Sequence, residues 1–140
     1  MSKNPSSWEK YGFKYLQLSL WPFAKNKYQL LQDYKIQTNL RLSQEARIPY
    51  ISLSTSGMLT VHKGFIWNGA SGPTWDSKCS MRASCGHDAV FELIRLGIIS
   101  VGAVTLTNVQ FIKECVEDGM SRVRANLWYL FLRKFSYLYC

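Results

Sequence analysis

Hydrophobic and polar positions alternate through much of the first half of the chain, a pattern that is typical of β-strands. The alternation covers 27–42 and returns in a second run at 48–53. Gly57 marks a turn before a third run at 58–67. We therefore predict a small antiparallel sheet that contains a β-hairpin between residues 51 and 61.

The spacing of apolar residues changes after a glycine-rich loop at 68–73, whose sequence is Asn-Gly-Ala-Ser-Gly-Pro. Beyond it, helical spacing predicts three helices, over about 80–97, 105–118 and 122–137. Residues suited to cap these helices are Ser80, Thr107 and Ser121 at the starts, and Gly97 and Gly119 at the first two ends. Strands followed by helices indicate an α+β fold.

The length of 140 residues fits one compact domain. We assign a single α+β domain to 27–140 and an aromatic, basic N-terminal arm to 1–26, which contains Trp8 and Trp21. A strand that covers the core is an equally good interpretation of these first residues.

The net charge of +8 favours contact with an acidic partner. The basic residues are spread along the chain without a nucleic-acid-binding motif, so nucleic acid is less favoured than an acidic protein. No stretch approaches the ~20 apolar residues that a membrane-spanning helix needs. The polar start is unlike a secretory signal peptide, and we expect all four cysteines to be reduced.

Polar residues that are unusual in their surroundings gather between positions 68 and 118. Ser84, His87 and Asp88 share one face of the first predicted helix. The others are Asn68 and Ser71 in the glycine loop, Asp76 after it, Asn108 in the second helix, and Glu117 and Asp118 at that helix's end.

The segments GFIWNGASGPTWDSK, MRASCGHDAVFELIRLG and VEDGMSRVRANLWYLFLR carry a resemblance. Together they resemble the phage and prophage family called domain of unknown function 1353. Its pattern is an Asp-Gly-Ala-Ser-x-Pro loop followed by a helix with Ser-x-x-His-Asp. The resemblance covers about Lys63 to Arg133 and implies a small phage-encoded or prophage-encoded protein, without implying an activity.

Two departures from the family pattern bear on chemistry. The family usually has Asp where this chain has Asn68 and Asn108. Each Asn keeps the hydrogen-bonding shape of Asp but removes a carboxylate. A metal site or general base that needed those carboxylates would be weakened here, whereas backbone capping would be nearly unchanged.

Two interpretations of the polar residues follow. In the favoured one they form a structural network that fastens the glycine loop to the helix; its members are Asn68, Ser71, Ser84, His87, Asp88 and Asn108. In the alternative, a hydrolase directed at the cell wall uses His87 and Asp88, with Asp76 and Ser71 as further candidates. No catalytic residue is assigned and no cofactor is predicted, and a divalent metal near His87 is left open.

The last predicted helix is apolar around most of its circumference, with basic residues at both ends. This indicates burial in the domain or in a partner; a core helix whose arginines reach the surface is the commoner arrangement, and an anchor on a membrane surface is a further alternative. The expected partner-binding residues are Trp8, Trp21, Arg122, Arg124, Arg133 and Lys134. The leading hypothesis is a phage-encoded, non-enzymatic component of the virion or tail, with phage structural proteins as partners, in the host cytoplasm and the virion. The second alternative is an anti-host protein that binds an acidic target, and an oligomer is compatible with either.

Overall fold

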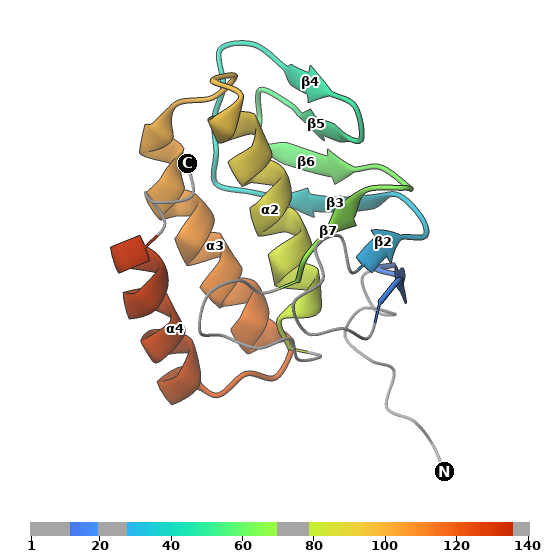
Figure 1. Ribbon diagram of the computed structural model, residues 1–140. Coiled ribbons are helices and arrows are strands. Elements are labelled where there is room, and N and C mark those ends of the chain that lie inside the picture. Colours follow the sequence, from blue (N-terminus) through green and yellow to red (C-terminus); the bar gives the residue numbers. More distant parts are fainter. Residues whose placement is uncertain (1–11, 20–27, 70–78, 136–140) are drawn as a thin grey trace.

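The computed structural model describes residues 12–19, 28–69 and 79–135 (Figure 1). Within these residues, short strands come first and three α-helices follow. The fold is α+β, as the sequence predicts.

The strands form two small antiparallel sheets, where we expected one. The first sheet has the order β1-β2-β7, with β1 at Tyr15–Gln17, β2 at Tyr28–Leu30 and β7 at Ile66–Trp67. The second has the order β3-β6-β5-β4, with β3 at Tyr34–Gln37, β4 at Ala46–Ile48, β5 at Ile51–Leu53 and β6 at Met58–Val61. The predicted hairpin is confirmed, because β5 and β6 pair with Leu53 opposite Leu59.

Two turns divide what the alternation suggested were continuous strands. Pro49 and Tyr50 separate β4 from β5, and Tyr50 adopts a positive φ of 70°. Gly64, with φ of 99°, lies between β6 and β7, and β7 then pairs with β2 in the other sheet. The runs at 48–53 and 58–67 are therefore two strands each, since apolar alternation continues across a turn although the backbone reverses.

Part of the segment predicted as an arm belongs to the folded domain. β1 pairs with β2, and Phe13 is fully buried with its ring against those of Tyr34 and Trp67. Between the two interpretations of the first residues, a strand that covers the core describes residues 13–17. Trp8 and Trp21 lie outside the described residues.

The helices are α2 at Met81–Arg95, α3 at Val104–Glu117 and α4 at Arg122–Phe135, with a short 3₁₀ helix η1 at Val101–Ala103. Gly97 ends α2 with φ of 72°, and the N–H of Ile98 bonds to the carbonyl of Leu93. Ser121 caps α4, because its hydroxyl accepts the N–H of Arg124 at 3.2 Å.

Two of the predicted helix caps are not formed. The hydroxyl of Thr107 donates to the carbonyl of Ala103 inside α3. Thr107 is therefore a helix-interior residue, and the turn of η1 leads into α3 without a side-chain cap. Ser80 precedes α2, but its side chain makes no capping bond there.

The three α-helices form a layer beside the second sheet (Figure 1). α2 packs against β6, α3 packs against α2, and α4 packs against α3. The main core lies between the sheets and α2, and a smaller apolar cluster joins the helices; its buried members are Ala83, Phe111, Cys115, Met120, Ala125 and Trp128. Among the described cysteines, Cys79, Cys85 and Cys115 are free thiols.

Candidate functional site

His87 lies on α2 where that helix faces α3. Its Nε2 donates to Oδ1 of Asn108 on α3 at 2.8 Å. The ring stacks on Phe91 at 4.2 Å between centroids and meets the edge of Phe111. Its side chain is only 11% exposed, and Nδ1 is 3.8 Å from Asp88. His87 therefore links two helices through a polar bond inside an aromatic setting.

The other polar residues of the predicted network have different partners. Ser84 is buried, and its hydroxyl accepts the indole N–H of Trp67 at 3.0 Å. This bond ties β7, the strand that leads into the glycine loop, to α2. Asn68 is exposed at the end of β7, while Ser71 and Asp76 lie outside the described residues.

A cleft of about 820 Å³ lies beside this part of α2. Its walls come from β7, from α2 and from the end of α4, and residues of the family-like motifs are among them; these are Trp67, Asn68, His87 and Asp88. The structure therefore brings Asn68 and the His87–Asp88 pair to one cavity.

In the described part of the chain, no three side chains of His, Cys, Asp or Glu lie close enough to hold a metal ion together. Asn108 is buried and bonded to His87.

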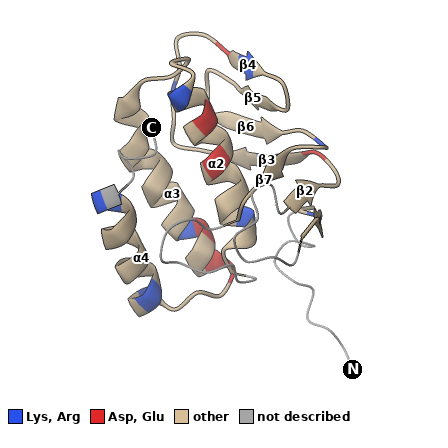
Figure 2. Ribbon diagram, viewed as in Figure 1, with Lys and Arg blue, Asp and Glu red and all other residues tan. Residues whose placement is uncertain are grey.

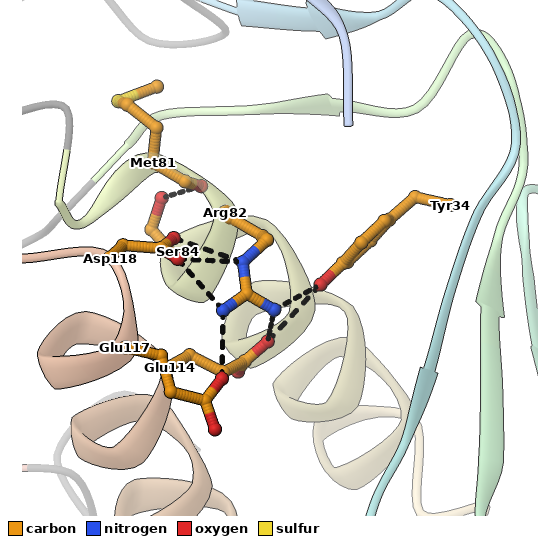
Figure 3. Close-up of polar contacts among 7 residues, drawn as sticks. All are labelled: Tyr34, Met81, Arg82, Ser84, Glu114, Glu117 and Asp118. Atoms are coloured by element: carbon orange, nitrogen blue, oxygen red, sulfur yellow. Dashed lines mark hydrogen bonds and ion pairs between the residues drawn. The ribbon is translucent and has the colours of Figure 1, made fainter. Parts of the chain in front are cut away.

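The most buried polar cluster surrounds Arg82 on α2 (Figure 3). Its Nη1 donates to the Tyr34 hydroxyl at 2.9 Å and to Glu114 at 3.2 Å, and its Nη2 donates to Glu117 at 3.1 Å. Nε and Nη2 also donate to Asp118, each at 3.0 Å. All five guanidinium N–H groups can therefore be satisfied, which a buried charge requires.

The charges in this cluster do not balance if every group is ionised. One guanidinium faces three carboxylates, and Arg82 and Glu114 are each 2% exposed. Burial raises the pKa of Glu114 to about 8, although Arg82 and the Tyr34 hydroxyl act in the opposite direction. Burial also raises the pKa of Tyr34, so its hydroxyl stays protonated and able to donate.

Sequence reasoning identified Glu117 and Asp118 as unusual but missed Arg82 and Glu114. The signal was present, because each charged residue stands in line with apolar residues of its helix. Arg82 comes three residues before the buried Cys85, and Glu114 follows the buried Phe111 by three. A positive charge and a negative charge on the buried faces of successive helices indicate a paired interior site.

Helix α4 exposes a row of apolar side chains. Val123, Leu127 and Leu130 are 74%, 62% and 59% exposed and follow one another at the spacing of a single helix face. Basic residues lie at both ends of α4, and it has no acidic residue (Figure 2). No helix in the described part of the chain is both long and apolar enough to cross a membrane.

The basic residues predicted to bind a partner fall into two groups. Arg122, Arg133 and Lys134 are exposed. Arg124 is partly buried instead, with its guanidinium over the Trp128 ring at 4.9 Å from the centroid. The first three therefore lie at the surface, and Arg124 packs within the domain.

Comparisons with protein-family models, with curated proteins and with solved structures found no match. The resemblance to the phage family stays a prediction from the motifs themselves.

Proposed function

We propose that the chain is a phage-encoded accessory component of the virion or tail that acts by binding, with α4 as its docking face for an acidic protein surface. The observation that carries this proposal is the exposed row of Val123, Leu127 and Leu130 on a helix without acidic residues. Exposed apolar patches bordered by charge are typical of protein-binding surfaces.

The chemistry of α4 also selects the kind of partner. Exposed Arg122, Arg133 and Lys134 border the apolar row, so a partner surface with acidic groups around an apolar centre fits it. Two α4 faces from copies of this chain would bring like charges together, which disfavours self-association through α4.

The setting of His87 supports a structural role for the motif residues. A general base needs a ring nitrogen that reaches a bound substrate. The side chain of His87 is only 11% exposed, its Nε2 donates to Asn108, and its ring is held against Phe91 and Phe111. The amide of Asn108 serves as acceptor without a carboxylate, so the departure from the family pattern leaves this link intact.

The test is co-sedimentation of the purified protein with purified particles of the phage that encodes it. Two variants are compared, Leu127→Glu/Leu130→Glu on α4 and Leu16→Glu on β1, where Leu16 is 49% exposed. We expect the wild type and the Leu16 variant to sediment with particles and the α4 variant to stay in the supernatant. Thermal unfolding of all three checks that they are equally folded, since exposed substitutions cost within about 0.5 kcal/mol.

Other outcomes would favour the alternatives. The anti-host role would be favoured if the protein did not sediment with particles but co-purified from infected cells with an acidic host protein, and if the α4 variant lost that co-purification. Loss of a measured cell-wall hydrolysis in a folded His87→Ala variant would favour the hydrolase at His87 and Asp88.

A further inference from the structure

The second sheet has a face turned away from α2. Leu59 lies on the α2 side, where its side chain approaches Gly86, and the next residue, Thr60, points to the opposite side. Ser52 is paired with Thr60 in the ladder, so both belong to this opposite face, and Arg47 follows as the neighbour of Ser52 on β4. His62 continues the alternation from Thr60, directly after β6.

Three side chains on this face form a hydrogen-bonded chain. Oγ of Ser52 is 3.0 Å from Nε2 of His62, and Nδ1 of His62 is 3.4 Å from Oδ2 of Asp33. The other carboxylate oxygen of Asp33 accepts the backbone N–H of Lys63 at 2.8 Å. The backbone N–H of His62 bonds to the carbonyl of Tyr50 at 2.7 Å, which holds the histidine at this point.

The chemistry of the three groups sets the direction of these bonds. The Lys63 N–H, followed by the bond from His62, lowers the pKa of Asp33, so its carboxylate is ionised and only accepts. Nδ1 of His62 must then carry the hydrogen, which leaves Nε2 as the acceptor in the neutral ring. Ser52 therefore donates its hydroxyl hydrogen to Nε2, the polarity that an activated serine needs.

We propose that Ser52 is a nucleophile for small carboxylic esters, with His62 as its general base and Asp33 as a positioning residue. This goes beyond the binding role of α4 and concerns a different part of the molecule. Oγ of Ser52 attacks the ester carbonyl while its proton passes to Nε2 of His62. The ester C–O bond then breaks, and the leaving alkoxide takes that proton as the acyl group stays on Ser52.

Deacylation reverses the roles. Water gives a proton to Nε2 of His62 and attacks the acyl carbonyl, and the carboxylic acid leaves as Oγ of Ser52 regains the proton. The side chains of His62 and Asp33 are 40% and 55% exposed, whereas Ser52 is 9% exposed, so an ester has to reach Oγ of Ser52 from the side on which His62 is open to solvent. Arg47 lies cross-strand from Ser52, and its exposed guanidinium donates to Glu45 at 3.0 Å.

A fluorophosphonate probe tests the nucleophile directly, because attack by Oγ forms an O–P bond and expels fluoride. Mass spectrometry of the labelled full chain locates the adduct. We expect one adduct, on Ser52, with labelling slowed about 100-fold in His62→Gln. Labelling should be unchanged in Ser43→Ala, a control at an exposed serine. Hydrolysis of 4-nitrophenyl acetate should fall in Ser52→Ala and not in Ser43→Ala.

The tautomer of His62 provides a second readout, which does not depend on how efficiently the probe labels Ser52. The chain has only two histidines, so ring ¹⁵N spectra are assigned with the His62→Gln variant. We expect the Nδ1–H form of His62 in the wild type and a mixture of forms in Asp33→Asn. The proposal is overturned by an Nε2–H tautomer, by no adduct on Ser52, or by equal labelling in the folded His62→Gln variant.

Discussion

At the scale of single residues, Arg82 illustrates how a buried charge is retained inside a small domain. Its N–H groups reach Tyr34 and three carboxylates, and the guanidinium is 2% exposed. Removing one member of such a cluster leaves the others buried without compensation. The fold should therefore depend on this side chain far more than on an exposed arginine.

Replacing Arg82 with Ala should lower the free energy of unfolding by about 3–5 kcal/mol. Arg95→Ala is the control, since Arg95 is half-exposed and pairs with Glu92 at the end of α2; its cost should be about 0–1 kcal/mol. Urea denaturation measures both. Equal and small losses would show that the cluster contributes little to stability.

Glu114 should make stability fall as the pH rises. Its pKa in the folded protein is about 8 against an ordinary value of 4.5, so the folded state holds a proton that the unfolded state releases. This contribution is fully present below about pH 4.5 and is lost as the pH rises through 8.

Glu114→Gln removes this protonation equilibrium and replaces the carboxyl group with an amide that can still form hydrogen bonds. Relative to the wild type, the variant should gain on the order of a few kcal/mol between pH 5.5 and 8.5. Urea titrations at both pH values measure the difference. A constant difference would mean that Glu114 is ionised throughout this range.

At the scale of elements, α2 and α3 are joined by a polar pair as well as by apolar packing. The bond between His87 and Asn108 lies beside Phe91 and Phe111, so the two helices have one preferred alignment. The Ser84–Trp67 bond does the same between α2 and β7.

His87→Ala and Asn108→Ala should therefore be non-additive. Each removes the same bond, so the double variant should be less destabilised than the sum by about 0.5–3 kcal/mol. Denaturant unfolding of the four proteins gives this coupling. Combining His87→Ala with Asn126→Ala, a change at an exposed position of α4, should be additive.

The sequence predicts elements better than their partners. The helices follow from apolar spacing and from glycines such as Gly97, because these signals are local. The division into two sheets does not follow, since it depends on the turn at Gly64, after which β7 pairs back to β2 and not with β6. His87 was recognisable as unusual, but its bond to Asn108 depends on how α2 meets α3.

Sequence reasoning also missed the hydrogen-bonded side chains at Ser52, because they too depend on contacts between separate elements. Asp33, Ser52 and His62 are separated along the chain, because Asp33 directly precedes β3, Ser52 lies in β5 and His62 directly follows β6. Ser52 and His62 meet because β5 and β6 form a hairpin, but no local pattern brings Asp33, 29 residues before His62, to the same place.

At the scale of the whole molecule, charge and apolar exposure combine on α4. The helix packs on α3 through its buried side and exposes an apolar row with basic ends (Figure 2). Four of the 17 Lys and Arg residues of the chain lie on this helix. Binding to an acidic surface should weaken with added salt and with Arg133→Glu/Lys134→Glu, mainly through slower association.

The most direct test of the binding role is the protein content of purified phage particles. Particles are assembled in cells that supply either the wild-type chain or Leu127→Glu/Leu130→Glu, and the chain is quantified by mass spectrometry relative to a major structural protein. We predict a fixed amount of the wild-type chain per particle, and only a small fraction of that amount for the α4 variant. Absence of the wild-type chain from particles, or equal amounts of both chains, would contradict the account.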